Sequence, residues 1–116
     1  MMDIASIDQM RDKHRLLLDE SLRRIIQQLS ELPSVEKVIL FGSYAAGRRD
    51  LFTDLDIVVI MQSDQAFIDR IAGIYLLLQP AVDLDILVYT PEEFKRLSQS
   101  GFLRTVLEMG QVLYEK

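Results

Sequence analysis

The sequence predicts an α/β domain in which helices pack against a small mixed β-sheet. Three short apolar runs of strand length alternate with segments whose apolar residues recur at helical spacing. The connection between the first two runs is short, so we expect those two strands to be antiparallel and the sheet to be mixed. The chain has 116 residues, of which 49% are hydrophobic, and this content suits one domain with a modest core.

The first predicted element is a long amphipathic helix from about Ser6 to Glu31, which Pro33 ends. We assign residues 1–32 to this N-terminal segment. His14 is the only histidine. It is predicted to be a solvated residue of the helix rather than a catalytic base, since no nucleophile is placed near it. The apolar positions that define the helix are Ile7, Met10, Leu17, Leu18, Leu22, Ile25, Ile26 and Leu29.

Three strands are predicted from apolar runs that stand between turn-forming residues. Between the second and the third strand, Ser63 and Asp64 are predicted to cap a helix that continues to about Gln79. Pro80 ends that helix because proline cannot continue it. The predicted strands are Val35 to Phe41, Asp54 to Met61 and Ala81 to Tyr89.

The C-terminal part opens with a strong helix-start signal. Thr90 is the predicted N-cap, Pro91 occupies the first helical position, and Glu93 completes a capping box. This helix is predicted to extend to about Leu97. A last short helix over residues 102–107 is ended by a glycine, and a small strand or tail follows it.

The residues that carry chemistry are concentrated around the second strand. Gly42 lets the backbone bend or approach a ligand closely, and Ser43 places a hydroxyl at the turn. Ser43 has a second reading, as the N-cap of a short helix from Tyr44. Asp54 and Asp56 are predicted to share one strand face, roughly 7 Å apart along the chain. Like charges so placed suit a divalent cation, because Mg²⁺ takes carboxylate oxygens together with substrate phosphates.

This pattern resembles the minimal nucleotidyltransferase domains of the DNA polymerase beta superfamily. The resemblance covers roughly residues 35 to 114 and includes the strand that carries Asp85. It implies a nucleotidyltransferase fold over residues 1–116, with a catalytic core at 35–89 and C-terminal helices and tail at 90–116. The residues that carry the motif are Gly42, Ser43, Gly47, Asp54 and Asp56, in the register usual for the family.

The resemblance also implies roles for the acids. Asp54 and Asp56 would be catalytic residues that hold two Mg²⁺ ions, and Asp85 would complete the metal site and accept a proton. Asp83 lies on the same predicted strand and is the alternative to Asp85 as the third acid. The substrate implied by this set is a nucleoside triphosphate.

The phosphate-binding residues implied by the resemblance are Gly42 and Ser43. Relatives often have arginine at the position that Ala46 occupies here. Arg48 or Arg49 is therefore expected to supply the missing positive charge and to help grip the phosphates.

Small proteins that this chain resembles are commonly paired with a helical toxin protein, and act as antitoxins that adenylylate a tyrosine of the toxin. The expected function is therefore transfer of a nucleoside monophosphate, AMP from ATP, to a hydroxyl of a partner protein. The other open class is a binding module that keeps the fold but masks its partner sterically. Three acids on adjacent strands favour the enzyme, because a steric module has no need of them.

Composition argues against several other classes. The chain carries 18 acidic and 13 basic residues, a net charge of −5, and its bases are scattered, which argues against a nucleic-acid binder. It has no cysteine, which excludes disulfides and thiolate metal sites. No apolar run approaches the roughly 18 residues that a membrane span needs, and the N-terminus lacks signal-peptide features. A cytoplasmic protein without membrane contact is the expectation.

Overall fold

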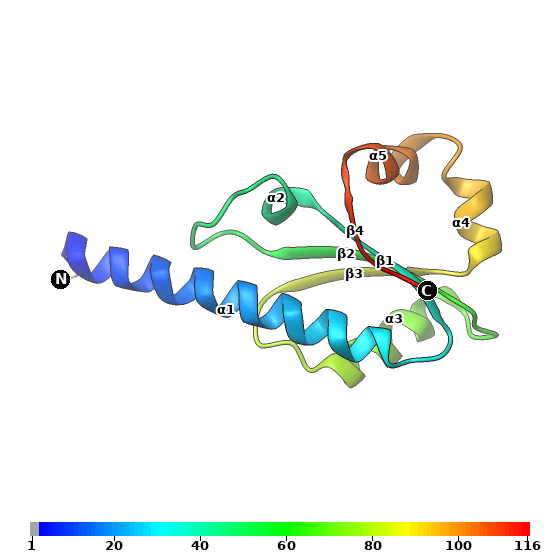
Figure 1. The fold of residues 1–116 in the computed structure, drawn as a ribbon, viewed down its shortest axis with the longest axis horizontal. Coiled ribbons are helices and arrows are strands. Elements are labelled where there is room, and N and C mark those ends of the chain that lie inside the picture. The colour runs from blue at the N-terminus through cyan, green and yellow to red at the C-terminus, as the bar shows by residue number, and fades with distance from the viewer. Residues whose placement is uncertain (1–2) are drawn as a thin grey trace.

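The fold has three layers, with a four-stranded sheet between two pairs of helices (Figure 1). The structure is a computed structural model that describes residues 3–116. One face of the sheet is covered by α1 (Ile4–Ser30) and α3 (Phe67–Leu78), and the other by α4 (Pro91–Leu97) and α5 (Gly101–Met109). The predicted α/β fold class with helices against a small mixed sheet is confirmed.

The strands are β1 (Val35–Phe41), β2 (Leu55–Met61), β3 (Leu84–Tyr89) and β4 (Gln111–Glu115), arranged in the order β3-β2-β1-β4. β1 pairs antiparallel with both β2 and β4, as predicted for the first two strands. β2 pairs in parallel with β3, because α3 crosses over between them. The starts of β2 and β3 therefore meet at the end of the sheet where β1 finishes.

The core lies on both faces of the sheet because strand residues alternate between them. Leu55, Ile57 and Val59 of β2 pack in the larger cluster, under α1 and α3. Val58 and Ile60 of the same strand pack in the smaller cluster, under α4 and α5. Both faces of the central strands are thus apolar, except at the end where β2 and β3 begin.

The starts of α1 and α3 differ from the predictions. α1 begins at Ile4, because Asp3 caps it by accepting a 2.8 Å hydrogen bond from the Ser6 amide. Met1 and Met2 of the predicted 1–32 segment lie outside the described residues. The predicted cap of α3 at Ser63 and Asp64 is wrong, because the Ser63 hydroxyl accepts from the Gln65 amide and stabilises a turn. The capping box at Thr90 is present.

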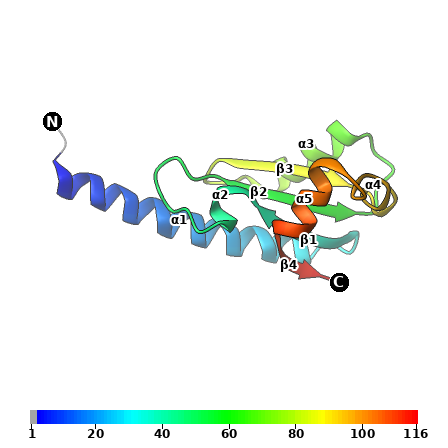
Figure 2. The ribbon, with the colours of Figure 1, turned by 90° about the horizontal axis from the view of Figure 1, so that it is seen from above.

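α1 is much longer than the sheet that it covers. It has 27 residues, and its N-terminal half projects past the end of the sheet where β2 and β3 begin (Figures 1 and 2). Its buried residues all lie in its C-terminal half, from Leu18 onward. Among residues 3–116, no helix combines the length and the apolar character that crossing a membrane requires.

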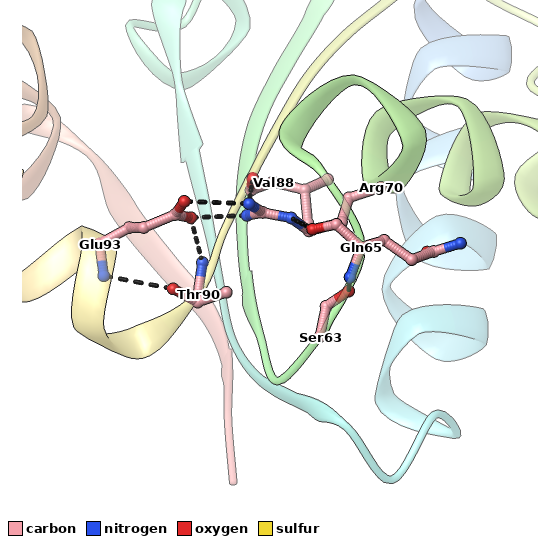
Figure 3. A network of polar contacts seen from close by, with 6 residues as sticks. All are labelled: Ser63, Gln65, Arg70, Val88, Thr90 and Glu93. Carbon is pink, nitrogen blue, oxygen red and sulfur yellow. Dashed lines mark hydrogen bonds and ion pairs between the residues drawn. The ribbon is translucent and has the colours of Figure 1, made fainter.

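A buried ion pair joins α3 to α4 at the other end of β3 (Figure 3). The Arg70 side chain is 5% exposed and donates two hydrogen bonds, of 2.6 and 2.9 Å, to the Glu93 carboxylate. Arg70 also donates to the carbonyl oxygens of Val88 and Gln65, both at 3.0 Å. The Thr90 amide donates to Glu93, so the capping box and the ion pair share one carboxylate.

We expect Arg70→Met to lower the free energy of unfolding by about 2 kcal/mol, below the range for fully buried pairs because Glu93 is partly exposed. The hydrogen bond from Arg70 and the one from the Thr90 amide lower the pKa of Glu93 to about 2. A lowered pKa means that this stabilisation is present above pH 4.5 and is lost as the pH falls toward 2.

Thermal unfolding of the parent and of Arg70→Met at pH 7 and at pH 3 measures this effect. The difference between the two proteins should shrink at the lower pH. Glu93→Gln is the matched control, and the double variant Arg70→Met/Glu93→Gln should lose less than the sum of the single losses. Strictly additive losses, or a difference that does not change with pH, would argue against a coupled pair.

Candidate active site

The elements that carry most of the predicted site residues meet at the end of the sheet where β1 finishes and β2 begins (Figure 2). β1 leads directly into the short helix α2 (Gly42–Ala45). Phe41 pairs with Asp56 across the antiparallel ladder, so the start of α2 lies beside the start of β2. Gly42 and Asp56, 14 positions apart in the sequence, are thereby brought into contact.

Gly42 lies directly against the Asp56 carboxylate. A Cβ atom built on Gly42 would stand 2.1 Å from Oδ2 and 2.9 Å from Cγ of Asp56, far inside any real contact distance. Gly42 also has a φ of 78°, a backbone conformation that residues other than glycine rarely adopt. The residue is thus required twice, for its backbone conformation and for the space that Asp56 fills.

Asp56 faces Asp85 on the neighbouring strand. The parallel register of β2 and β3 pairs these two residues, and neighbouring strands lie about 4.8 Å apart. Partial burial, a hydrogen bond with the Asp85 carboxyl and the negative charges of Asp85 and Asp54 raise the pKa of Asp56 to about 6. The negative charges of the two carboxyl groups therefore repel each other across the two strands.

Asp54 and Asp83 each precede a strand. Asp54 is half-buried just before β2, and its charge acts on Asp56. Asp83 accepts a 3.1 Å hydrogen bond from the Leu55 amide through its backbone carbonyl. Asp83 is also among the residues that line a cavity of about 320 Å³, together with His14 and Tyr75. The geometry thus places Asp85, and not Asp83, opposite Asp56.

The carboxyl pair has the chemistry of a magnesium site. Its oxygens are hard ligands, and among the described residues no basic side chain lowers the pKa of Asp56. Within residues 3–116, however, no three His, Cys, Asp or Glu side chains are gathered into a metal-holding group. The pair therefore fits a divalent cation whose remaining ligands would come from substrate and water, as is usual for Mg²⁺.

Ser43 occupies the second position of α2. Phe41 stands at the N-cap and makes no side-chain capping bond, so the reading of Ser43 as the N-cap of a helix from Tyr44 is wrong. The helix begins earlier because Gly42 already turns the chain. Ser43 is half-buried, and its carbonyl accepts a 3.0 Å hydrogen bond from the Arg48 amide.

The two arginines predicted to bind phosphate make different contacts. Arg48 is exposed and pairs with Asp50, Nε to Oδ2, at 2.6 Å. Arg49 stacks on the Tyr44 ring at 3.4 Å from its centroid and donates a 2.8 Å hydrogen bond to the Tyr44 carbonyl. Exposed ion pairs are weak, so Arg48 is the more easily released of the two.

α2 and the loop that follows it are held against α1 by contacts that sequence reasoning missed. The Tyr44 hydroxyl donates to the Asp19 carboxylate, which also lies 3.7 Å from Nε of Arg49. The ring of His14, through Nε2, hydrogen-bonds the Thr53 carbonyl at 3.1 Å. His14 is half-buried, so its prediction as a solvated residue is wrong. No sequence signal marks these pairs, since their members lie 25 and 39 residues apart.

An apolar pocket adjoins Gly42 on the side away from α1. It has a volume of about 330 Å³ and lies between α2 and α5. Phe41 and Phe102 pack edge to face within it, with ring centroids 5.4 Å apart. A flat apolar group held there would lie close to the acidic pair, because Gly42 borders both.

Comparison with protein families gives one clear match. The family described as "Polymerase beta, Nucleotidyltransferase" matches residues 23–116. A protein of Methanocaldococcus jannaschii named "Putative protein adenylyltransferase MJ0604" is 36% identical over 80 residues, which are 69% of this chain and 79% of that protein.

Solved structures with the same fold include two informative neighbours. A crystal structure described as "a putative nucleotidyltransferase from Sulfolobus solfataricus" has a TM-score of 0.64 at 17% identity, and covers 91% of this chain and 87% of its own. A structure described as a "toxin-antitoxin with AMP-PNP" has a TM-score of 0.52 at 23% identity, over 81% of this chain and 73% of its own. At these identities the likeness concerns the fold.

Proposed function

The chain belongs to the polymerase beta nucleotidyltransferase family, and from this premise we propose that it transfers AMP from ATP to a hydroxyl of a partner protein. The observation that carries the proposal is the Asp56 and Asp85 pair, set against the backbone of Gly42 at the open end of the sheet. Within the described part of the chain no basic side chain lowers the pKa of Asp56, so its charge is available to a metal ion. A nucleoside triphosphate with bound Mg²⁺ would supply that ion together with the phosphates.

Asp54 and Asp56 are the proposed ligands of two Mg²⁺ ions, and Asp85 is proposed to complete the set. When bound, the ions would offset phosphate charge and make the acceptor hydroxyl easier to deprotonate. Asp85 is exposed and is proposed to take the proton as the hydroxyl oxygen bonds to the α-phosphorus. The bond from that phosphorus to the leaving pyrophosphate then breaks.

The proposed phosphate-binding residues are Gly42, Ser43, Arg48 and Arg49. Gly42 and Ser43 would offer the amides at the start of α2 and the Ser43 hydroxyl. Arg48 is the better placed arginine to reach a phosphate, since only an exposed carboxylate holds it. Arg49 would act by holding α2 and the following loop in place, through its contacts with Tyr44 and Asp19.

A protein acceptor is supported by the charge of the chain and by the proteins that it resembles. The net charge of −5 and the clustered acids disfavour a polynucleotide acceptor. The archaeal relative is named as a protein adenylyltransferase, and a neighbour in fold is a toxin-antitoxin complex with AMP-PNP. We therefore propose a helical, toxin-like partner whose tyrosine receives the nucleotide.

The test incubates the purified chain with labelled ATP, Mg²⁺ and the product of the neighbouring reading frame. Mass spectrometry should show an AMP adduct on the partner, and the adduct should be absent with the Asp54→Asn variant. A tight complex without adduct under any nucleoside triphosphate would instead support a module that masks its partner. The absence of both complex and adduct would refute a protein acceptor encoded beside this chain.

The choice of the third acid gives a separate prediction. We expect Asp85→Asn to lower the rate of transfer by about 100-fold or more, the scale of losing a general base. Asp83→Asn is the matched control two residues away and should change the rate little, because Asp85, and not Asp83, pairs with Asp56 across the two strands. A larger loss for Asp83→Asn would reverse the assignment.

A further inference from the structure

Asp54 lies just before the strand pairings that hold the rest of the acidic site. Along β2, the pairing with β3 begins at Leu55 and the pairing with β1 begins at Asp56. The φ and ψ of Asp54 turn the two peptide groups on either side of it, since the peptide groups themselves are planar. The direction of the Asp54 side chain therefore depends on how these two peptide groups are held.

Each of the two peptide groups is held by a hydrogen bond to another part of the chain. After Asp54, the Leu55 amide donates to the Asp83 carbonyl at 3.1 Å. Before Asp54, the Thr53 carbonyl is bonded at 3.1 Å by Nε2 of His14, which lies on α1. A carbonyl oxygen only accepts, so Nε2 of His14 is the donor. The two bonds together hold the backbone on both sides of Asp54.

The side chain and the amide of Thr53 are engaged within its own turn. The hydroxyl bonds the amide and the carboxylate of Asp50, at 3.0 and 3.2 Å, and the Thr53 amide donates to the Asp50 carbonyl at 3.1 Å. These bonds close the turn from Asp50 to Thr53 but do not attach it to the helices. The bond from His14 attaches the end of this turn to α1.

The bond to His14 lies in a buried place. Thr53 is 1% exposed, so without its donor the carbonyl would be left as a buried acceptor with no partner, which native structures avoid. His14 stands four residues before Leu18, the first buried residue of α1, and the two therefore share one face of the helix. His14 extends this packed face of α1 to the residue that precedes Asp54.

We propose that His14 is a positioning residue for the transfer reaction. By holding the Thr53 carbonyl against α1, it sets the backbone conformation of Asp54 and with it the direction of the carboxylate. The inference rests on the proposed function, which makes Asp54 a ligand of Mg²⁺. His14 needs no charge for this role, because Nε2 can donate from the neutral ring as well. Residues that orient a metal ligand without touching the metal affect metal affinity or activity by about 10-fold to 100-fold.

Two variants separate the hydrogen bond from the bulk of the side chain. Leucine in His14→Leu fills space without a donor, whereas the amide of His14→Gln can donate near the position of Nε2. Calorimetry with Mn²⁺ and ATP measures binding of the metal nucleotide. His14→Leu should bind about tenfold more weakly than the parent, and His14→Gln within about twofold of it. In the transfer assay, the Mg²⁺ concentration that gives half the maximal rate should rise about tenfold for His14→Leu alone.

Hydrogen exchange without metal or nucleotide gives an independent measurement. The Leu55 amide should exchange about tenfold faster in His14→Leu than in the parent. The Val58 amide in the centre of β2 is the internal control and should keep its rate. Equal acceleration of both amides would mean that the variant loosens the whole sheet, and would overturn a role specific to Asp54.

The binding experiment also distinguishes this inference from the proposed function. A His14→Leu variant that binds Mn²⁺ and ATP as the parent does, or a His14→Gln variant impaired as much as His14→Leu, overturns the role of His14. If the parent binds Mn²⁺ and ATP but transfers nothing to any acceptor, the proposed transfer is wrong, while the comparison of affinities still supports or refutes the role of His14. A parent that binds no Mn²⁺ with ATP overturns both.

Discussion

Asp56→Asn is expected to reduce nucleotide transfer by about 1,000-fold or more, which is roughly 4 kcal/mol of lost transition-state stabilisation. The amide keeps the shape of the side chain but removes the charge that would hold a cation next to the phosphates. Calorimetry with ATP and Mg²⁺ should show that binding to the variant no longer depends on the metal. Asp54→Asn should behave alike. If either variant bound ATP and Mg²⁺ as the parent does, the metal assignment would be wrong.

The same substitution should stabilise the protein when no metal is present. The pKa of Asp56 is raised to about 6, so the folded state binds a proton more tightly than the unfolded chain does. The favourable contribution is therefore complete below pH 3.8 and is lost as the pH rises through 6. Above that pH we expect Asp56→Asn to gain about 1 kcal/mol over the parent, a small value because the side chain is only half-buried.

Thermal unfolding in the presence of a chelator, at several pH values, distinguishes relief of charge repulsion from a change in packing that does not depend on pH. The advantage of Asp56→Asn over the parent should grow between pH 4 and pH 7. Adding Mg²⁺ and ATP should raise the unfolding temperature of the parent and leave that of the variant unchanged. An advantage that is constant over this pH range would mean that the two carboxylates do not repel each other in the folded protein.

Gly42→Ala is expected to abolish activity while the chain still folds. The new methyl group would stand 2.1 Å from Oδ2 of Asp56, so the carboxylate must move away from its position opposite Asp85. We expect a loss of transfer of about 1,000-fold, similar to removal of the carboxylate itself. The positive φ of 78° should in addition cost about 1 to 2 kcal/mol of stability.

Gly47→Ala is the matched control for this prediction. Gly47 has a φ of 97°, so alanine there carries the same kind of backbone cost, yet its Cβ would meet no atom within 4 Å. Both variants should lose similar stability in thermal unfolding, but only Gly42→Ala should lose most of its transfer rate. Equal losses of activity would show that the contact with Asp56 is not what makes Gly42 necessary.

The sequence alone was sufficient for the features that depend on local chemistry. The spacing of apolar residues predicted α1 and the strands to within a few residues, and Thr90 with Glu93 predicted the capping box. These features are local because a helix cap or a strand face is set by residues a few positions apart. The roles of Asp54, Asp56 and Asp85 in the candidate site likewise came from a motif, and they stay predictions.

The tertiary structure decided which groups meet. The register of β2 and β3 placed Asp85 opposite Asp56 and left Asp83 before the start of β3, a choice that acids at both positions 83 and 85 leave open in the sequence. Burial and neighbouring charge then shifted the pKa of Asp56. Contacts such as Tyr44 with Asp19 join residues far apart in the chain. Such pairs arise when helices pack on a sheet, and no local pattern of residues encodes them.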